Sequence, residues 1–149
     1  MKKLFKSLLA CVAMLALAIP AQAAVSVVDV GMTNTIVANA TTTDNLGNAV
    51  LVDNHDRAAF VFKFQGAATN QTGNLTVKIS RSSDGTTYET IGFSSTVAAN
   101  GTNAVVGFVD IPTTSMSSAK YLKVLSIANA NADLTVTNCS LQVILKKVK

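Results

Sequence analysis

Apolar side chains alternate with other residues in two stretches of the segment Arg57–Phe93. The alternating residues are Phe60, Phe62 and Phe64 in the first stretch and Leu75, Val77 and Ile79 in the second. Because successive side chains of a strand point to opposite faces, a period of two places each set on one face of its strand. Asp84-Gly85 is a strong hairpin signal and predicts a third strand over Thr87–Phe93. The segment therefore predicts the middle of an antiparallel β-sheet with one apolar face.

Short apolar runs separated by turn residues fill the rest of the chain. Further strands are expected over Val25–Val30, Thr35–Ala38, Ala49–Asp53, Ala104–Ile111, Lys120–Ile127 and Leu134–Lys146. The run Lys120–Ile127 is apolar on both faces and predicts a central strand, and Asn100-Gly101 predicts the tip of a second hairpin. In the last strand the apolar parity changes near Asn138, which predicts a β-bulge. About eight short strands predict an all-β fold, an antiparallel β-sandwich of the jelly-roll or immunoglobulin-like kind.

The N-terminal residues have the pattern of a Sec-type secretory signal. Three lysines, an apolar run over Leu8–Ile19 and small residues follow one another up to Ala24. This order predicts cleavage after Ala23 or Ala24 and a secreted protein, extracellular or on the cell surface, with the periplasm as the alternative. A lipoprotein signal ending at Cys11 is a second reading, but it would leave an apolar run on the mature protein.

The length and charge of the chain bound its organisation. With 149 residues there is room for one domain. We expect a signal over 1–23, an N-terminal strand segment and loop over 24–48 that is a candidate assembly arm, and a β-sandwich core over 49–149. Without the three lysines of the signal, nine basic side chains face eight acidic ones, a balance of +1. So small a charge favours neither nucleic acid nor an anionic membrane as a partner.

The titratable residues form no recognisable catalytic pattern. The acidic side chains fall almost entirely in predicted turns or beside strand ends, and the chain has a single histidine, His55. No nucleophile elbow, zinc-protease, phosphate-loop or dinucleotide motif is present. The sequence therefore predicts a protein that is not an enzyme.

One predicted turn carries several hard oxygen ligands. Asp53, Asn54 and Asp56 are the ligand types that Ca²⁺ prefers, although their spacing matches no EF-hand loop. A hydrogen-bonded Asx turn is the alternative explanation for the same residues. Calcium is the only cofactor for which the sequence offers ligands.

Signal cleavage removes Cys11 and leaves Cys139 as the only cysteine, so no intrachain disulfide can form. Cys139 shares its strand parity with Leu141 and Val143, which predicts a small buried hydrophobe. The alternative is an intersubunit crosslink through this unpaired thiol.

A resemblance to known proteins rests on three segments: Leu75–Ser80, the hairpin Ser82–Tyr88 and the strand Tyr121–Val124. Their order, with a Ser-x-Asp-Gly-Thr-x-aromatic hairpin between strands, resembles small β-sandwich proteins among phage and prophage structural components. It is similar, more loosely, to discoidin-like carbohydrate-binding modules, whose motif ends in Trp where Tyr88 stands here. The resemblance covers about Arg57–Leu145 and implies a structural or sugar-binding role. For a sugar, Tyr88 and Tyr121 are the candidate contacts, because an aromatic face stacks on a pyranose ring.

Self-assembly is the function that the composition favours. Charge is low, and Thr76, Lys78 and Ser80 are expected on the outer face of their strand. The mature N-terminus is apolar and prone to form strands, so it is suited to pairing with a neighbouring subunit by β-strand addition. The candidate assembly residues are Val25, Val27, Val28, Val30, Ile36 and Val37. The alternative is that this segment pairs within its own sandwich.

Together these features predict an exported structural protein. It is expected to form a homo-oligomer or polymer, as the subunit of an extracellular filament, sheath or matrix, through pairing of strand edges. The alternative function is a secreted carbohydrate-binding or adhesive module that recognises a surface glycan. Neither function requires a membrane partner after the signal is cleaved.

Overall fold

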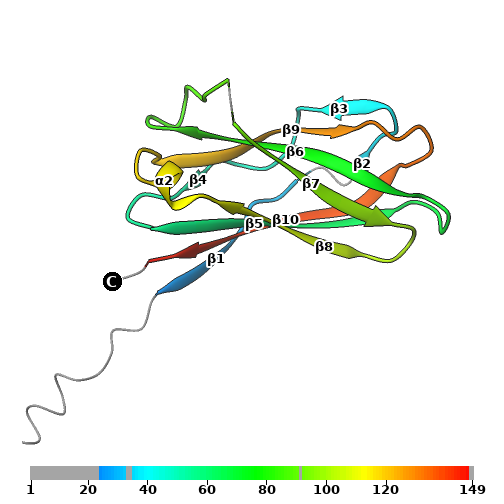
Figure 1. The fold of residues 1–149 in the computed structure, drawn as a ribbon, viewed down its shortest axis with the longest axis horizontal. Coiled ribbons are helices and arrows are strands. Elements are labelled where there is room, and N and C mark those ends of the chain that lie inside the picture. Colours follow the sequence, from blue (N-terminus) through cyan, green and yellow to red (C-terminus); the bar gives the residue numbers. More distant parts are fainter. Residues whose placement is uncertain (1–23, 33–34, 91, 148–149) are drawn as a thin grey trace, which may run out of the picture.

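The structure, a computed structural model, describes residues 24–32, 35–90 and 92–147. The predicted signal over 1–23, with Cys11, lies outside these residues. The described chain forms two antiparallel sheets packed face to face (Figure 1). The strands of the first sheet are β1 (Val25–Asp29), β2 (Thr35–Ile36), β5 (Arg57–Gly66), β8 (Val105–Ile111) and β10 (Val136–Lys146). Those of the second sheet are β3 (Ala40–Thr42), β4 (Val50–Leu51), β6 (Thr72–Ser82), β7 (Phe93–Asn100) and β9 (Tyr121–Asn129).

The order of the strands defines the topology. The first sheet has the order β1-β10-β5-β8, with β2 also pairing with β10, and the second has the order β3-β9-β6-β7, with β4 also pairing with β9. Taking each pair of short strands on a common neighbour as one broken strand gives two sheets of four. First and last strands lie side by side, and the chain passes repeatedly between the sheets, as in a jelly roll. The predicted antiparallel β-sandwich is confirmed.

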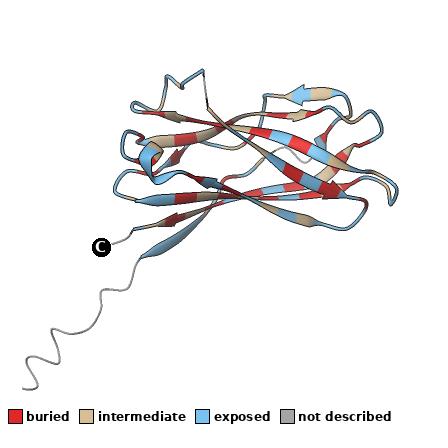
Figure 2. Cartoon of the chain, in the orientation of Figure 1, coloured by how far each residue is buried: buried red, intermediate tan, exposed pale blue. Residues whose placement is uncertain are grey.

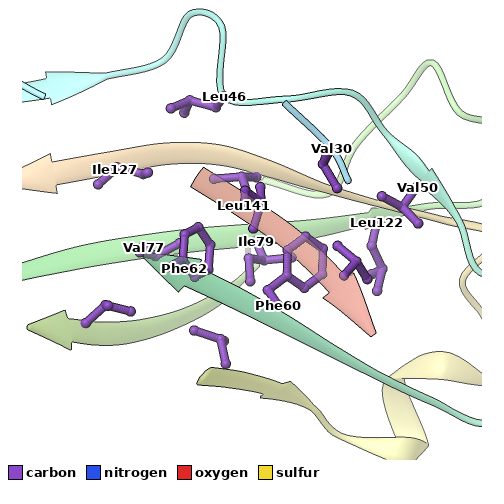
Figure 3. Packing of buried hydrophobic residues seen from close by; sticks show 14 of the residues in the cluster. Val30, Leu46, Val50, Phe60, Phe62, Val77, Ile79, Leu122, Ile127 and Leu141 are labelled. Atoms are coloured by element: carbon purple, nitrogen blue, oxygen red, sulfur yellow. The ribbon is translucent and has the colours of Figure 1, made fainter. Parts of the chain in front are cut away.

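The core lies between the two sheets and is filled by the alternating sets seen in the sequence. The side chains of Phe60, Phe62, Phe64, Leu75, Val77 and Ile79 are all fully buried. Figure 3 shows Phe60 and Phe62 from β5 beside Val77 and Ile79 from β6. The ring centroids of Phe62 and Phe64 are 5.6 Å apart, within the range of favourable aromatic contacts. The period of two therefore predicted the inner face of each strand correctly.

The predicted pairing of these strands was wrong. β5 and β6 were expected side by side in one sheet, but they belong to opposite sheets and face each other across the core. The connection between them is a corner from one sheet to the other. The Asn100-Gly101 turn is likewise a corner, because β7 and β8 also lie in different sheets. Both sheets of a sandwich turn apolar side chains inward, so alternation does not distinguish a hairpin from a corner.

The predicted third strand over Thr87–Phe93 was also wrong, since β7 begins only at Phe93. β6 and β7 do pair antiparallel, but a long loop joins them in place of a two-residue hairpin. The Asp84 carboxylate accepts hydrogen bonds from the backbone N–H of Thr86 and Thr87, both at 2.8 Å. These backbone donors are therefore turned inward to a side chain and cannot continue a β-ladder.

Two irregularities in strand pairing explain details of the sequence. In β10 the register with β5 shifts between Thr137 and Ser140, and Asn138 has a φ of 49°. The predicted bulge near Asn138 is confirmed. β9 is paired on both sides, as its two-sided apolar pattern predicted, and its register with β6 shifts between Lys78 and Ile79. Ser80 follows this shift and is fully buried, where an outward position was expected.

The connection after β8 contains the short helix α2 (Thr113–Met116), which the sequence did not predict. Pro112 precedes it at the N-cap, and Met116 of the helix is buried. In the described part of the chain, no helix is long and apolar enough to cross a membrane.

The segment over 24–48, predicted as an arm, contributes to the core. Val30, Ile36 and Leu46 are buried together with the phenylalanines of β5. Its first strand, β1, is largely exposed and pairs with β10 of the same chain. This is the arrangement given above as the alternative to pairing with a neighbouring subunit.

Candidate functional site

The outer face of the first sheet carries a group of exposed and half-buried apolar side chains. We call these residues the outer apolar face: Val25, Val27, Ala59, Val61, Val106, Phe108 and Ile144. Phe108 is 61% exposed and Val27 is 60% exposed. On each strand these residues alternate with side chains on the side turned toward the second sheet, so all seven point away from the core.

Strand register brings these residues together across the sheet. Val27 is opposite Ile144, which is opposite Ala59. One row further along, Val61 is opposite Phe108. Residues opposite one another across a sheet have Cβ atoms about 5 Å apart. The outer apolar face is therefore continuous from one edge strand to the other.

Charges of both signs surround the outer apolar face. The basic residues are Arg57, Lys63 and Lys146, and the acidic ones are Asp29 and Asp110. Asp29 accepts a hydrogen bond from Gln142 Nε2 at 2.7 Å. Among the described residues the only ion pair is Arg81–Glu89, which lies elsewhere. None of the charges around this face is engaged in an ion pair within the described part of the chain.

The edge strand β1 has unpaired backbone groups. Hydrogen bonds from Val30 N to Leu141 O and from Lys147 N to Ala24 O, both 3.1 Å, show that the even-numbered residues bond to β10. In an antiparallel pair the direction of the backbone groups alternates along the strand. The N–H and C=O groups of Val25, Val27 and Asp29 therefore point away from the sheet.

The same alternation determines which backbone groups of the edge strand β8 are unpaired. The odd-numbered residues of β10 make their backbone hydrogen bonds to β1. The even-numbered residues of β10 therefore make theirs to the odd-numbered residues of β5. The even residues of β5 then bond to the odd residues of β8. This leaves the N–H and C=O groups of Val106, Phe108 and Asp110 pointing away from the sheet.

The strand β1 is exposed along most of its length, as its mostly pale blue colour in Figure 2 shows. Ser26, on the side turned toward the second sheet, is exposed, and Val28 on that side is only half-buried. Of the predicted assembly residues, Val25, Val27 and Val37 are more than half exposed. Val30 and Ile36 are buried in the core and do not lie on the surface.

The loop between β6 and β7 brings the two tyrosines together around one glycine. Tyr88 Oη donates a hydrogen bond to the Gly85 carbonyl at 3.3 Å. Gly85 has a φ of 80°, and a Cβ atom there would lie 3.1 Å from the Tyr121 ring. Burial, together with the nearby charge of Asp84, raises the pKa of Tyr88. Both rings are partly buried, with the hydroxyl of Tyr88 turned to the loop.

A polar hollow of about 480 Å³ opens beside this loop. The Arg81 guanidinium lies on one side, where its Nε donates to Glu89 Oε2 at 2.7 Å and its Nη1 to Ser118 Oγ at 3.2 Å. Hydrogen bonds from Thr86, Thr87 and Ser82 hold the pKa of Asp84 well below its usual range. Arg81 and Glu89 were not singled out from the sequence, because Glu89 was assigned to a strand.

A larger hollow of about 600 Å³ lies between the segments 30–32 and 43–48. Lys123 is the only titratable side chain among its lining residues. Throughout the described part of the chain, no three or more His, Cys, Asp or Glu side chains are grouped as metal ligands would be. Neither hollow therefore presents a recognisable set of catalytic groups.

The predicted calcium ligands lie in a turn between β4 and β5. Asp53 and Asn54 are exposed, and Asn54 has a φ of 65°. The Asp53 carbonyl is within 3.1 Å of His55 Nδ1, and Asp56 N donates to Lys146 O at 3.0 Å. These contacts hold the turn and tie it to β10, and a calcium site there stays a prediction.

Cys139 lies on the inner side of β10 and is 6% exposed. Burial raises the pKa of its thiol to about 11. Cys139 is therefore buried, as its strand parity predicted. A crosslink to another chain requires a thiolate that can reach solvent, so this environment opposes the alternative of an intersubunit crosslink.

Comparison with known proteins identifies the fold but no family. No family model and no curated protein matches the sequence. A chain in the structure of the infectious bursal disease virus Gx strain is 13% identical over 85% of this chain and 32% of that chain, with a TM-score of 0.52. A chain of the T13 particle of that virus is 12% identical over 83% of this chain and 31% of that chain (TM-score 0.49), and a CBM4 structure is 16% identical over 84% and 76% (TM-score 0.41).

The chain thus spans about a third of the length of the viral chains that it matches. At this identity the likeness to the first of these chains, with its TM-score of 0.52, shows a shared fold alone, and function has to be argued from the surface of this molecule.

Proposed function

We propose that this protein is an exported structural subunit, without enzymatic activity, that assembles with copies of itself through a strand edge. The observation that carries the proposal is the state of β1. This strand is held by one neighbour only, is exposed at four of its five residues and turns the backbone groups of three residues outward.

An edge of this kind favours the addition of another strand. Soluble sheets usually protect an edge with lysine, proline or a bulge, whereas β1 reads Val-Ser-Val-Val-Asp and contains none of these. Each backbone hydrogen bond gained on pairing contributes about 0.5–1.5 kcal/mol net. Burial of Val25 and Val27 adds to this, because apolar area leaves water.

The edge can be tested by replacing Val27 with proline. The Val27 N–H points away from β10, so Val27→Pro removes a donor from the free edge and no hydrogen bond within the chain. The matched control Val27→Thr keeps the N–H and the β-branched shape. Light scattering and negative-stain microscopy of residues 24–149 would measure assembly of the three proteins.

We expect ordered polymers from the unmodified protein and from Val27→Thr, and folded monomers from Val27→Pro. A uniform monomer for the unmodified protein at high concentration would refute self-assembly. Equal assembly by all three proteins would show that the β1 edge is not the contact. Repeating the measurement with EDTA would test whether assembly needs calcium bound at the Asp53–Asp56 turn.

A second candidate function is a secreted module that recognises a surface glycan. The observation in its favour is the grouping of Tyr88 and Tyr121 around Gly85, beside the hollow with Arg81 and Glu89. An aromatic ring beside charged hydrogen-bonding groups is a usual arrangement for binding a sugar. A glycan array would test it, with binding expected for the unmodified protein and lost in Tyr88→Ala. Absence of binding by the unmodified protein would refute this candidate.

A further inference from the structure

We infer that the free edge of β1 in one copy pairs with the free edge of β8 in the next copy. The first sheets of successive copies then join head to tail into one continuous sheet. This inference rests on the proposed self-assembly and adds to it the identity of the partner strand.

The two edges are matched in their backbone groups. Val25, Val27 and Asp29 turn N–H and C=O groups outward from β1, and residues 106, 108 and 110 do the same from β8. Within the sheet the strands alternate in direction from β1 to β8, so β8 runs opposite to β1. A neighbouring copy placed beside β8 in the same orientation therefore presents β1 antiparallel to it. The antiparallel ladder continues across the joint without a break.

The side chains at the two edges are also matched. With Val27 opposite Phe108, a β-branched residue meets an aromatic one, which is a favourable cross-strand pair. The outer apolar faces of the two copies then become one continuous apolar strip. Both residues are more than half exposed in the single chain.

The charges beside the joint are complementary in this register. Asp110 of one copy is opposite Val25 of the next copy, and Val25 lies beside Lys146 of its own chain. Asp29 of the second copy is opposite Val106 of the first, and Val106 lies beside Lys63 of its own chain. Each carboxylate thus lies two strands, or about 10 Å, from a lysine of the other copy. Long lysine side chains reach across much of that distance, and no like charges are opposite one another.

The inner side of the joint favours β8 over a second β1. Under β8 the sandwich is closed by β7: a Cβ atom on Gly107 would overlap Cγ1 of Val97. Under β1 it is only partly covered, since Ser26 is exposed and Val28, which packs against the core, is half-buried. Figure 1 shows β1 apart from the strands of the second sheet, and β7 above β8. Pairing with β8 places the partly covered inner side of β1 next to a covered one, whereas pairing two β1 strands joins two partly covered sides.

The symmetry of this contact agrees with an open polymer. Pairing of β1 with β1, or of β8 with β8, is a twofold contact and closes a dimer. Pairing of β1 with β8 uses two different surfaces of each copy, so every added copy leaves a free β1 at one end and a free β8 at the other. Such a contact generates chains unless its rotation closes a ring.

Cysteine crosslinking with a short bis-maleimide tests the pairing in the assembled full-length mature protein. Val25→Cys and Asp110→Cys are opposite each other in the proposed register and leave Val27 and Phe108 in place. The two variants carry tags of different mass, so that each kind of crosslinked dimer is identified by its size. Cys139 is buried and stays in place, and Thr96→Cys on the second sheet is the control.

We expect crosslinked mixed dimers from Val25→Cys with Asp110→Cys, and none from either variant alone or with Thr96→Cys. Dimers from Val25→Cys alone would overturn the inference in favour of β1 pairing with itself, and dimers from Asp110→Cys alone would do so in favour of β8. Polymers that form without any crosslinked dimer would also overturn it, while leaving self-assembly intact. Absence of polymers from all proteins by light scattering would overturn the proposed function itself.

Discussion

The two outer faces of the sandwich differ in chemistry although they have the same backbone structure. On the first sheet, four large apolar side chains are at least half exposed: Val25, Val27, Val106 and Phe108. On the second sheet Leu51 of β4 is also 55% exposed, but the outward positions of β6 and β7 carry mostly hydroxyl, amide and ammonium groups. Thr76 is opposite Thr96 there, and Lys78 is opposite Ser94.

This difference indicates that the outer face of the second sheet is suited to solvent and that of the first sheet to contact with another copy. Exposed threonine and serine are well solvated and give a second copy of the chain little reason to bind. Exposed valine and phenylalanine leave apolar area in water that association would remove, at about 25 cal/mol per Å². A large exposed apolar patch rimmed by polar groups marks an interaction surface in soluble proteins. We therefore expect the first sheet, with its two free edges, to carry the contacts between copies.

The largest effect on stability is expected from a substitution on the inner side of β5, and a substitution on the outer side of β8 should have almost none. Phe62→Ala removes a fully buried ring and should lower the free energy of unfolding by about 3–5 kcal/mol. Phe108→Ala removes an exposed ring and should change it by about 0.5 kcal/mol or less in the monomer. Urea denaturation at low protein concentration measures both. Equal losses would mean that Phe108 is part of the core and not of a contact surface.

Placing a charge on each outer face tests the comparison itself. Phe108→Lys should weaken assembly strongly, because it replaces the apolar cross-strand neighbour of Val27 at the joint with lysine, a residue that protects free strand edges from pairing. Thr96→Lys, on the second sheet, should leave assembly unchanged. Sedimentation velocity of both variants and of the unmodified protein gives the size distributions. Loss of assembly in Thr96→Lys with retention in Phe108→Lys would reverse the roles of the two faces.

A smaller, pH-dependent effect is expected from the inner side of β10. The pKa of the Cys139 thiol is raised to about 11, above the ordinary value near 8.5. The unfolded thiol therefore ionises first, and the free energy of unfolding should fall as the pH rises from about 8.5 toward 11. The decrease should be weaker in Cys139→Ala, which has no thiol to ionise. Identical pH profiles for both proteins would show that Cys139 is exposed to solvent.

The smallest effect is expected in the loop at the end of the second sheet. Hydrogen bonds from Thr86, Thr87 and Ser82 lower the pKa of Asp84. The carboxylate should hold the loop at any pH above its ordinary value of about 3.9, and this contribution should be lost progressively at lower pH. Chemical shifts of the Thr86 and Thr87 amides would report the change. Persistence of those shifts in Asp84→Ala at neutral pH would contradict this role.

Sequence patterns predicted those features of the fold that depend on neighbouring residues. Alternation identified the inner faces of β5 and β6, the change of parity identified the bulge at Asn138, and two-sided apolarity identified β9 as central. Each of these features depends on which side of a strand faces the core, and the pattern of apolar residues over a few consecutive positions is enough to show that. Strand partners are not recorded locally, so β5 and β6 were wrongly placed in one sheet.

The candidate surface was only partly predictable for a similar reason. The exposed valines of β1 were recognised, because an apolar N-terminal strand is unusual in itself. Val106 and Phe108 were not, because a strand that is apolar on both faces has the pattern of a central strand. Only the strand order shows that β8 is an edge and that these side chains face solvent. Arg81 and Glu89 were missed because Asp84 folds the loop away from the predicted hairpin.

Backbone amide exchange in the assembled and dissociated protein tests the central claim most directly. Six amides point out from the free edges of the first sheet: those of Val25, Val27, Asp29, Val106, Phe108 and Asp110. We predict fast exchange of all six in the monomer and strong protection in the assembly, with the edge strand β7 of the second sheet unchanged. Assembly that protects β7 and leaves these six amides in fast exchange would contradict the account.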